Sequence, residues 1–283
     1  MKIILHSYTF RDYPLEAAFK SALRFGWDAM ELQGAHFDQT NLDSELDRCM
    51  VIGEKYATPI HCVDFSADFI NDDPKIVQKS IDLLEKNIDV CATKSVHLMN
   101  GFTGFLVSDP QDFGKNGSAL ATDAHYERSA EALRHLGNVA SKHGVYLTLE
   151  IHMNTIHDTI ASTARLLDLV GSDHVLATPD PGNMLSTSTA EKSPEALDVL
   201  KDRIGHFHLK NCREENGHFS YSVRLADGHI DTYRYLEKLD ALDYNGAVCV
   251  EYCGEGDPQV AAQQDIKYVR NCLEWLIEGR PDP

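Results

Sequence analysis

The chain has 283 residues, of which 43% are hydrophobic, and its 26 basic and 44 acidic residues give a formal charge of −18. The apolar fraction is enough to build one sizeable core. So acidic a chain repels phosphate backbones and anionic lipid, which disfavours nucleic-acid binding and a highly phosphorylated substrate.

The seven cysteines and the start of the chain bear on the compartment. The cysteines are odd in number and form no CxxC pair, so free thiols in a reducing compartment are expected. The chain opens directly on a strand-like run, residues 1–5, without a charged and apolar leader. No apolar stretch reaches the roughly 18 residues of a membrane span. A cytoplasmic protein without a membrane partner is therefore predicted.

Short apolar runs alternate along the chain with longer segments of helical periodicity. The short runs predict eight strands, over 2–6, 29–32, 60–63, 95–99, 145–151, 175–178, 205–209 and 247–252. Five intervening segments place apolar residues on one helical face, over 14–25, 76–91, 125–143, 159–170 and 259–277. Repeated βα units without a break in composition predict a single (β/α)8 TIM-barrel domain over 1–283. An open doubly wound sheet is disfavoured because no glycine turn follows the first strand.

Two of the predicted connections are long. Segment 100–123 contains four glycines and one proline and follows the fourth strand, on the face where barrels build their active sites. It is a candidate lid, with a disordered surface excursion as the alternative. Segment 211–231 follows the seventh strand and carries Arg213 and Arg224.

The predicted strands end in polar residues. Buried in a barrel, such side chains are costly unless they have partners, which a metal ion and a polyhydroxylated substrate would supply. The residues are His6, Glu31, His61, Asp64, His97, Asn100, Glu150, His152, Asp180, Asn183, His206, His208, Lys210 and Glu251.

Four successive strands in the second half end in metal-binding residue types: Glu150, Asp180, His206 or His208, and Glu251. Three carboxylates and one imidazole suit a divalent cation such as Mn²⁺, Co²⁺ or Zn²⁺. The four groups meet only if their strands are neighbours, as around a barrel rim. Alternation points both histidines to one face, so one would bind metal and the other substrate, and spacing does not choose between them. Asp180 has a second interpretation as a helix cap, because Pro-Gly follows it.

Other catalytic motifs are missing from the sequence. There is no G-x-S-x-G, P-loop, G-x-G-x-x-G or H-E-x-x-H pattern. Cys253 lies two residues beyond Glu251 and would share its face. An inert pocket thiol is favoured there over a nucleophile.

Several segments resemble the xylose isomerase-like TIM-barrel superfamily, and within it the sugar phosphate isomerase/epimerase branch that includes the D-tagatose 3-epimerase and inosose dehydratase types. The segments are Leu149-Glu150-Ile151-His152, Asp180-Pro181-Gly182-Asn183-Met184, His206-Phe207-His208-Leu209-Lys210, Gly228-His229-Ile230-Asp231 and Gly246-Ala247-Val248-Cys249-Val250-Glu251-Tyr252. The resemblance spans nearly the whole chain. It is specific for the fold and the metal site, and not for the substrate.

The resemblance implies that Glu150, Asp180, His208 and Glu251 are the metal ligands, with Mn²⁺ as the ion and Co²⁺, Mg²⁺ or Zn²⁺ as alternatives. It also implies that the two glutamates act as an acid/base pair around an enediolate. A sugar substrate and a homo-oligomer, dimer or tetramer, are expected. The residues expected to bind the substrate are His6, His61, His97, Asn183, His206, Lys210 and Arg213.

Two departures from the epimerase pattern leave the reaction open. Asn183 stands where the epimerases carry a substrate-binding histidine, and Arg213 matches their arginine only loosely. His152, which the epimerases lack, faces the pocket by alternation from Glu150. It is either an independent general base or a residue that orients a ligand carboxylate. An independent histidine is also what a lyase acting on a 3-keto sugar would use.

Four functions are therefore compared. The leading hypothesis is a divalent-metal sugar isomerase or epimerase acting on a keto sugar. The alternative is a metal-dependent lyase, a dehydratase or C-glycoside-cleaving enzyme, acting on a 3-keto sugar. An apurinic-site endonuclease would need more ligands and a basic surface, which the charge of −18 opposes. A non-catalytic barrel is disfavoured because the ligand residues are intact.

Overall fold

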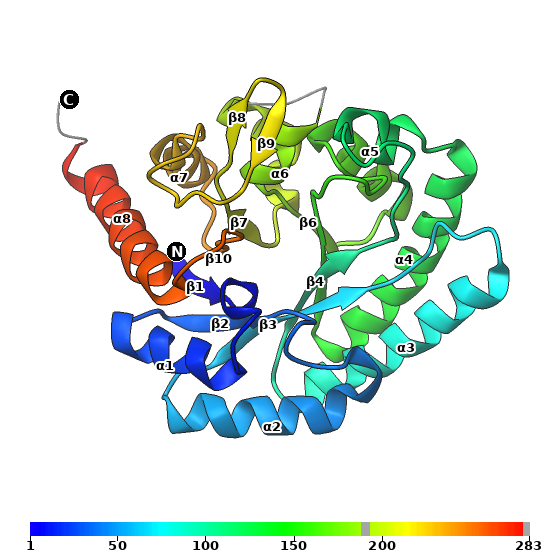
Figure 1. Cartoon of the computed structure of the whole chain (residues 1–283). Coiled ribbons are helices and arrows are strands. Elements are labelled where there is room, and N and C mark those ends of the chain that lie inside the picture. Colours follow the sequence, from blue (N-terminus) through cyan, green and yellow to red (C-terminus); the bar gives the residue numbers. More distant parts are fainter. Residues whose placement is uncertain (188–192, 280–283) are drawn as a thin grey trace.

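The computed structural model describes residues 1–187 and 193–279. Eight parallel strands form one sheet in the order β6-β5-β4-β3-β2-β1-β10-β7 (Figure 1). They are β1 (Lys2–His6), β2 (Ala29–Leu32), β3 (Ile60–Ser66), β4 (Leu98–Phe102), β5 (Tyr146–Glu150), β6 (Val175–Thr178), β7 (Phe207–Leu209) and β10 (Ala247–Val250). A bridge between Ala177 and Ile204 joins the two ends of this order, so the sheet is nearly closed. The predicted (β/α)8 TIM barrel is confirmed.

The helices surround this sheet (Figure 1). They are α1 (Leu15–Phe25), α2 (Leu42–Lys55), α3 (Pro74–Thr93), α4 (Asp123–His143), α5 (Ile160–Val170), α6 (Pro181–Ser186), α7 (Thr232–Ala241) and α8 (Pro258–Glu278). The five predicted helices are confirmed to within two residues at each end, and α4 stops at Gly144 with a φ of +65°. Helices α2, α6 and α7 were not predicted. The buried face of α2 has Leu42, Leu46, Cys49 and Gly53 at the i, i+4, i+7, i+11 spacing of a helix, so the sequence does carry a signal for α2.

One strand is displaced from its predicted position. Segment 95–99 was expected to be the fourth strand, but β4 begins three residues later, at Leu98. Ser95 instead takes a left-handed conformation with a φ of +58°, and the backbone N–H of Val96 donates to Cys91 O at the end of α3. The turn that ends α3 therefore uses the first residues of the apolar run.

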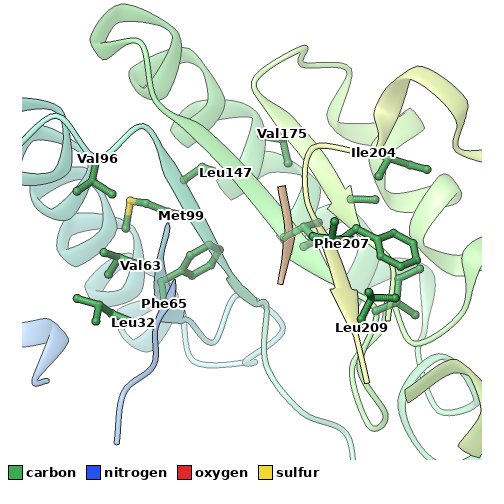
Figure 2. Packing of buried hydrophobic residues seen from close by; sticks show 14 of the residues in the cluster. Leu32, Val63, Phe65, Val96, Met99, Leu147, Val175, Ile204, Phe207 and Leu209 are labelled. Carbon is green, nitrogen blue, oxygen red and sulfur yellow. The ribbon is translucent and has the colours of Figure 1, made fainter. Parts of the chain in front are cut away.

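Successive side chains along each strand point alternately toward the surrounding helices and into the barrel interior. The side chains directed at the helices form one continuous apolar core that includes Leu32, Val63, Met99, Leu147 and Phe207 (Figure 2). The barrel interior has a small separate apolar cluster and, above it, polar side chains that are also fully buried: Glu31, Asn100, Thr148, His206 and His208. The hydrophobic core thus lies outside the strands, which leaves the interior for polar groups that need partners.

Segment 103–122 packs against the segment that follows β5. The Leu106 N–H donates to Asn154 O at 2.8 Å, and the Asn116 side-chain amide donates to Asn154 Oδ1 at 2.9 Å. The Ser118 N–H donates to the Asp158 carboxylate at 3.1 Å. The segment is therefore anchored beside the carboxyl end of β5, and its movement as a lid stays a prediction.

The second long connection contains an antiparallel hairpin, β8 (Arg213–Glu215) and β9 (His218–Ser220). Its turn residues Asn216 and Gly217 have φ values of +54° and +80°. An Asn-Gly pair is a strong hairpin signal, but the strands on either side of it are short and polar and show no alternating apolar pattern. In the described part of the chain no helix is both long and apolar enough to cross a membrane.

Candidate active site

Four side chains from neighbouring strands converge at the carboxyl end of the barrel. Glu150 ends β5, Asp180 follows β6, His208 lies in β7 and Glu251 follows β10. One ligand atom from each lies within 4.8 Å of the others, and all four residues are buried. The structure thus brings together the set that the sequence singled out.

His208 has a buried ring nitrogen without a hydrogen-bond partner. Its Nδ1 faces Glu150 Oε1 at 3.7 Å and Asp180 Oδ2 at 3.9 Å, while the residue is 0% exposed. Buried polar atoms are normally paired, so an unpaired nitrogen directed at two carboxylates needs an explanation. A divalent cation held by this nitrogen and the carboxylate oxygens would satisfy all of them, and the residues therefore fit such an ion.

The structure distinguishes the two histidines of β7. His206 lies deeper in the barrel, where its Nε2 is 2.6 Å from Glu31 Oε2, and it does not line the cavity at the rim. The expectation that His206 contacts a substrate is therefore wrong, because its ring is sealed beneath His208. The position that remains for the ligand is that of His208.

Two further polar side chains contact the carboxylates. Lys210 Nζ lies 2.7 Å from Glu251 Oε2 and 3.1 Å from Asp180 Oδ2. The Asn183 amide donates to Glu150 Oε1 at 2.9 Å and to Asp180 Oδ2 at 3.0 Å. The Asn183 N–H also donates to Asp180 Oδ1, so Asp180 caps α6 as well as facing the other carboxylates. The cap and ligand interpretations of Asp180 are thus compatible.

These contacts set the protonation of the two glutamates. Burial by itself raises the pKa of Glu150, but His208 beside it outweighs burial and lowers the pKa to about 2. Burial likewise opposes ionisation of Glu251, and Lys210 and His6 outweigh it and hold the pKa of Glu251 well below its usual range. Both carboxylates are therefore ionised at neutral pH, the form needed by a base or a metal ligand.

His6 connects Glu251 with Asp64. Its Nδ1 is 3.4 Å from Glu251 Oε1, and its Nε2 is 3.3 Å from Asp64 Oδ2. Burial lowers the pKa of His6, but the two carboxylates outweigh burial and raise the pKa to about 10. Its positive charge offsets part of the acidity of the rim.

A cavity of about 310 Å³ opens directly above these groups, within the size range of small-ligand pockets. Its lining residues are His6, Tyr8, Gln33, Asp64, Phe102, Glu150, His152, Met153, Asn183, Lys210, Tyr221, Glu251 and Cys253. Of the residues expected to bind substrate, His6, Asn183 and Lys210 lie in this wall.

His152 also lines the cavity. Its Nδ1 lies 2.8 Å from the carbonyl oxygen of Met153, which only accepts hydrogen bonds, so the neutral ring carries its proton on Nδ1. The rings of Phe102 and Phe105 pack against it, with centroids 4.9 Å and 6.0 Å away. The Nε2 lone pair of His152 is thus available for proton transfer.

Three expected substrate contacts lie elsewhere, and those expectations are wrong. His61 and His97 line a separate hollow at the amino end of the barrel, because His61 is the second residue of β3 and His97 precedes β4. The displaced start of β4 accounts for His97. Arg213 lies in the hairpin, donates to Asp227 O at 2.6 Å and lines another surface hollow.

Three polar cavity residues, and the apolar Phe102 and Met153, were not found from the sequence. Tyr8 and Gln33 follow β1 and β2, so the strand-end rule would have found them if it had been extended past the last strand residue. Tyr221 follows the hairpin and lies with its ring centroid 5.7 Å from Lys210 Nζ. No strand-end signal marks Tyr221, because a loop brings it to the cavity.

A family model of the xylose isomerase-like TIM barrel matches residues 19–272. The chain belongs to this family. The resemblance inferred from the sequence is thereby confirmed.

Several inosose dehydratases are similar to this family member in sequence. The one from Clostridium perfringens is 29% identical over 182 residues, which cover 58% of this chain and 56% of that protein. The one from Mesomycoplasma hyopneumoniae is 28% identical over 174 residues, 54% of this chain and 57% of that protein. The chain thus spans little more than half the length of these relatives.

Several solved structures share the fold at lower identity. A D-psicose 3-epimerase from Clostridium cellulolyticum, solved with D-tagatose, has a TM-score of 0.76 and 17% identity over 96% of this chain and 99% of that one. A 3-keto-D-glucoside 4-epimerase from E. coli has a TM-score of 0.75 and 18% identity, over 96% of this chain and 100% of that one. A xylose isomerase-like TIM barrel protein from Mycobacterium smegmatis, in complex with magnesium, has a TM-score of 0.76 and 19% identity, over 98% of this chain and 97% of that one.

Proposed function

We propose that the chain is a divalent-metal-dependent isomerase or epimerase that acts on a keto sugar or related polyol through an enediolate. The proposed ligands are Glu150, Asp180, His208 and Glu251, and the proposed ion is Mn²⁺, with Co²⁺, Mg²⁺ and Zn²⁺ as alternatives. The observation that carries this proposal is the unpaired, buried Nδ1 of His208 facing two carboxylates. When bound, such an ion supplies Lewis-acid stabilisation of negative charge on the substrate oxygens.

The two glutamates do the proton transfers in this proposal. Glu150 and Glu251 come from strands on opposite sides of the group, β5 and β10, and both line the cavity. One ionised carboxylate removes the proton next to the substrate carbonyl, and the other delivers a proton to the opposite face. Asn183 holds Glu150 and Lys210 holds Glu251, so each carboxylate has a partner that fixes its orientation.

A metal-dependent lyase acting on a 3-keto sugar is the second candidate. Two observations favour it: the free Nε2 of His152 at the cavity wall, and the similarity to inosose dehydratases. In this reaction His152 is the independent base: its Nε2 accepts the proton next to the carbonyl, and the imidazolium so formed returns that proton to the departing hydroxyl or alkoxide at the β-carbon. Both candidate reactions begin with loss of the proton next to the substrate carbonyl. Only in the lyase reaction does a hydroxyl or alkoxide then leave.

The inferences about partners, location and assembly rest on charge, on composition and on the family resemblance. We infer a small-molecule sugar partner, no nucleic-acid or membrane partner, a cytoplasmic location and a dimer or tetramer of single barrel domains. The charge of −18 supports the exclusion of nucleic acid, since phosphate binding needs basic surface. Segment 100–123, anchored beside the cavity, is the proposed lid.

Incubation of the purified protein with 2-keto and 3-keto sugars in D₂O tests both candidates. Deuterium incorporation with a new stereoisomer supports the epimerase, and release of water or an aglycone supports the lyase. Elemental analysis should find one divalent ion per chain, and chelation should remove both ion and activity. Metal-free protein with full activity, or Glu150→Gln with undiminished metal content, would refute the metal centre.

A further inference from the structure

A carboxylate without access to solvent lies directly beneath the proposed metal centre. Glu31 in β2 is 0% exposed and has three side-chain nitrogen atoms within hydrogen-bond distance. His206 Nε2 is 2.6 Å from its Oε2, and His208 Nε2 and Asn100 Nδ2 are each 3.2 Å from its Oε1. Glu31 is outside the cavity lining, so it does not contact a substrate.

The contacts of Glu31 decide which nitrogen of His208 carries the proton. Asn100 Nδ2 also lies 3.3 Å from His208 Nε2, so that nitrogen either accepts from the amide or donates to the carboxylate. An unprotonated Nε2 would place its lone pair against a carboxylate oxygen at 3.2 Å, between two side chains that have no exposed surface. An ionised carboxylate only accepts hydrogen bonds, so Nε2 must be the donor.

The geometry points to Glu31 as the positioning residue of the site. By accepting a hydrogen bond from Nε2, it leaves Nδ1 of His208 as the nitrogen that loses its proton when a cation binds, with its lone pair directed between Glu150 and Asp180. This inference rests on the proposed metal centre. A partner of this kind fixes the tautomer and the ring orientation of a ligating histidine, and its loss typically weakens metal binding about 10- to 100-fold.

The same residues could instead form a second metal site. Glu31, His206, His208 and Cys249 each place one donor atom within 4.8 Å of the others. Their donor atoms, however, are already engaged with one another: both imidazoles bond to the carboxylate at its two oxygens, and the Cys249 thiol bonds to it as well. Hydrogen bonding therefore accounts for this cluster without an ion.

Glu31→Gln tests the inference through metal affinity. The glutamine side chain has one accepting oxygen and one donating NH₂ group where Glu31 has two accepting oxygens. Either His206 or His208 therefore loses its hydrogen-bond acceptor. We expect Mn²⁺ and Zn²⁺ to bind about 10- to 100-fold more weakly in competition with a chromogenic chelator. Glu31→Asp, which restores a carboxylate, should recover part of the affinity. Glu85→Gln is the matched control, because Glu85 makes a 2.6 Å contact with His135 on the surface, and its affinity should equal that of wild type.

A second measurement does not depend on the variants folding. In Zn²⁺-loaded wild-type protein with labelled histidines, nuclear magnetic resonance should show His208 protonated on Nε2 and ligated through Nδ1. Ligation through Nε2, two Zn²⁺ ions per chain, or wild-type affinity in a folded Glu31→Gln would each overturn the role of Glu31. Wild-type protein that binds no metal would instead refute the proposed function itself.

Discussion

The ammonium of Lys210 lies 2.7 Å from Glu251 Oε2, between two of the four carboxylate and imidazole groups proposed to bind an ion. The ammonium neutralises part of the negative charge of the carboxylates. It would also repel a bound metal cation, because both are positively charged. The sequence placed Lys210 among the residues that bind substrate. The structure adds that it competes electrostatically with the proposed metal.

Lys210→Met should therefore bind Mn²⁺ more tightly than wild type while turning over more slowly. Removing a buried like charge favours the cation by about tenfold, or ~1.4 kcal/mol. Loss of the contact that orients Glu251 lowers kcat at the same time. Lys94→Met is the matched control, because Lys94 also pairs with two aspartates, Asp43 and Asp47, but on the surface. Weaker Mn²⁺ binding by Lys210→Met would contradict this account.

His152→Gln separates the two candidate reactions. If His152 protonates a leaving group, the variant should lose about 10²- to 10⁴-fold in kcat for elimination, while its metal content stays that of wild type. If the two glutamates suffice for epimerisation, kcat should change only a few-fold. His135→Gln, at an exposed histidine of α4, controls for the substitution. A fall in metal content would show that His152 orients a ligand instead.

The convergence of the proposed ligands was predictable because it needs only two rules. Strand alternation gives the face, and the neighbouring order of parallel strands gives the shared rim. Strand β6 has the predicted bounds and is followed by Asp180, and β5 and β10, which carry Glu150 and precede Glu251, begin and end within two residues of their predicted bounds. Depth along a strand was not predictable. The choice of His208 over His206 depends on register, with Cys249 of β10 opposite His208.

The errors arose where local turns override an apolar run. His97 was assigned to a strand end, but the left-handed Ser95 shifts β4 along the chain and leaves His97 at the opposite end of the barrel. Arg213 was assigned from a loose match to the arginine of the epimerases, and the hairpin directs it to Asp227. Tyr221 reaches the cavity from a loop, for which a strand pattern carries no information.

Asn116→Ala should loosen the segment beside the cavity. The Asn116 side chain is 1% exposed, accepts from the N–H groups of Ser108 and Asp109, and donates to Asp109 O and Asn154 Oδ1. Leaving such buried groups unpaired costs about 1–3 kcal/mol. We expect faster proteolysis within 103–122 and a higher KM. Asn71→Ala, in a part-buried contact with Asp68, is the control. Unchanged proteolysis would show that the anchor lies elsewhere.

Asp265→Asn should change how stability depends on pH. Burial raises the pKa of Asp265 to about 7, although the Leu225 N–H donates to it at 3.0 Å. The folded protein then binds a proton that the unfolded chain releases near pH 4, so stability falls by up to about 1.4 kcal/mol per pH unit as pH rises from 4 to 7.

The neutral asparagine removes this dependence. In urea unfolding, Asp265→Asn should be more stable than wild type at pH 8, and the difference should shrink toward pH 4.5. Asp240→Asn, at an exposed position of α7, controls for the lost charge. A stability gain that is the same at both pH values would rule out burial of the ionised group as its cause.

The barrel has a seam between β6 and β7, where a single bridge, Ala177 with Ile204, replaces a regular ladder. Asp180 follows one side of this seam and His208 lies on the other. An ion bound by both residues would hold β6 and β7 together at the junction of the sheet that has the fewest backbone hydrogen bonds. Metal binding should then stabilise the closed barrel, and amide exchange in β6 and β7 should slow together.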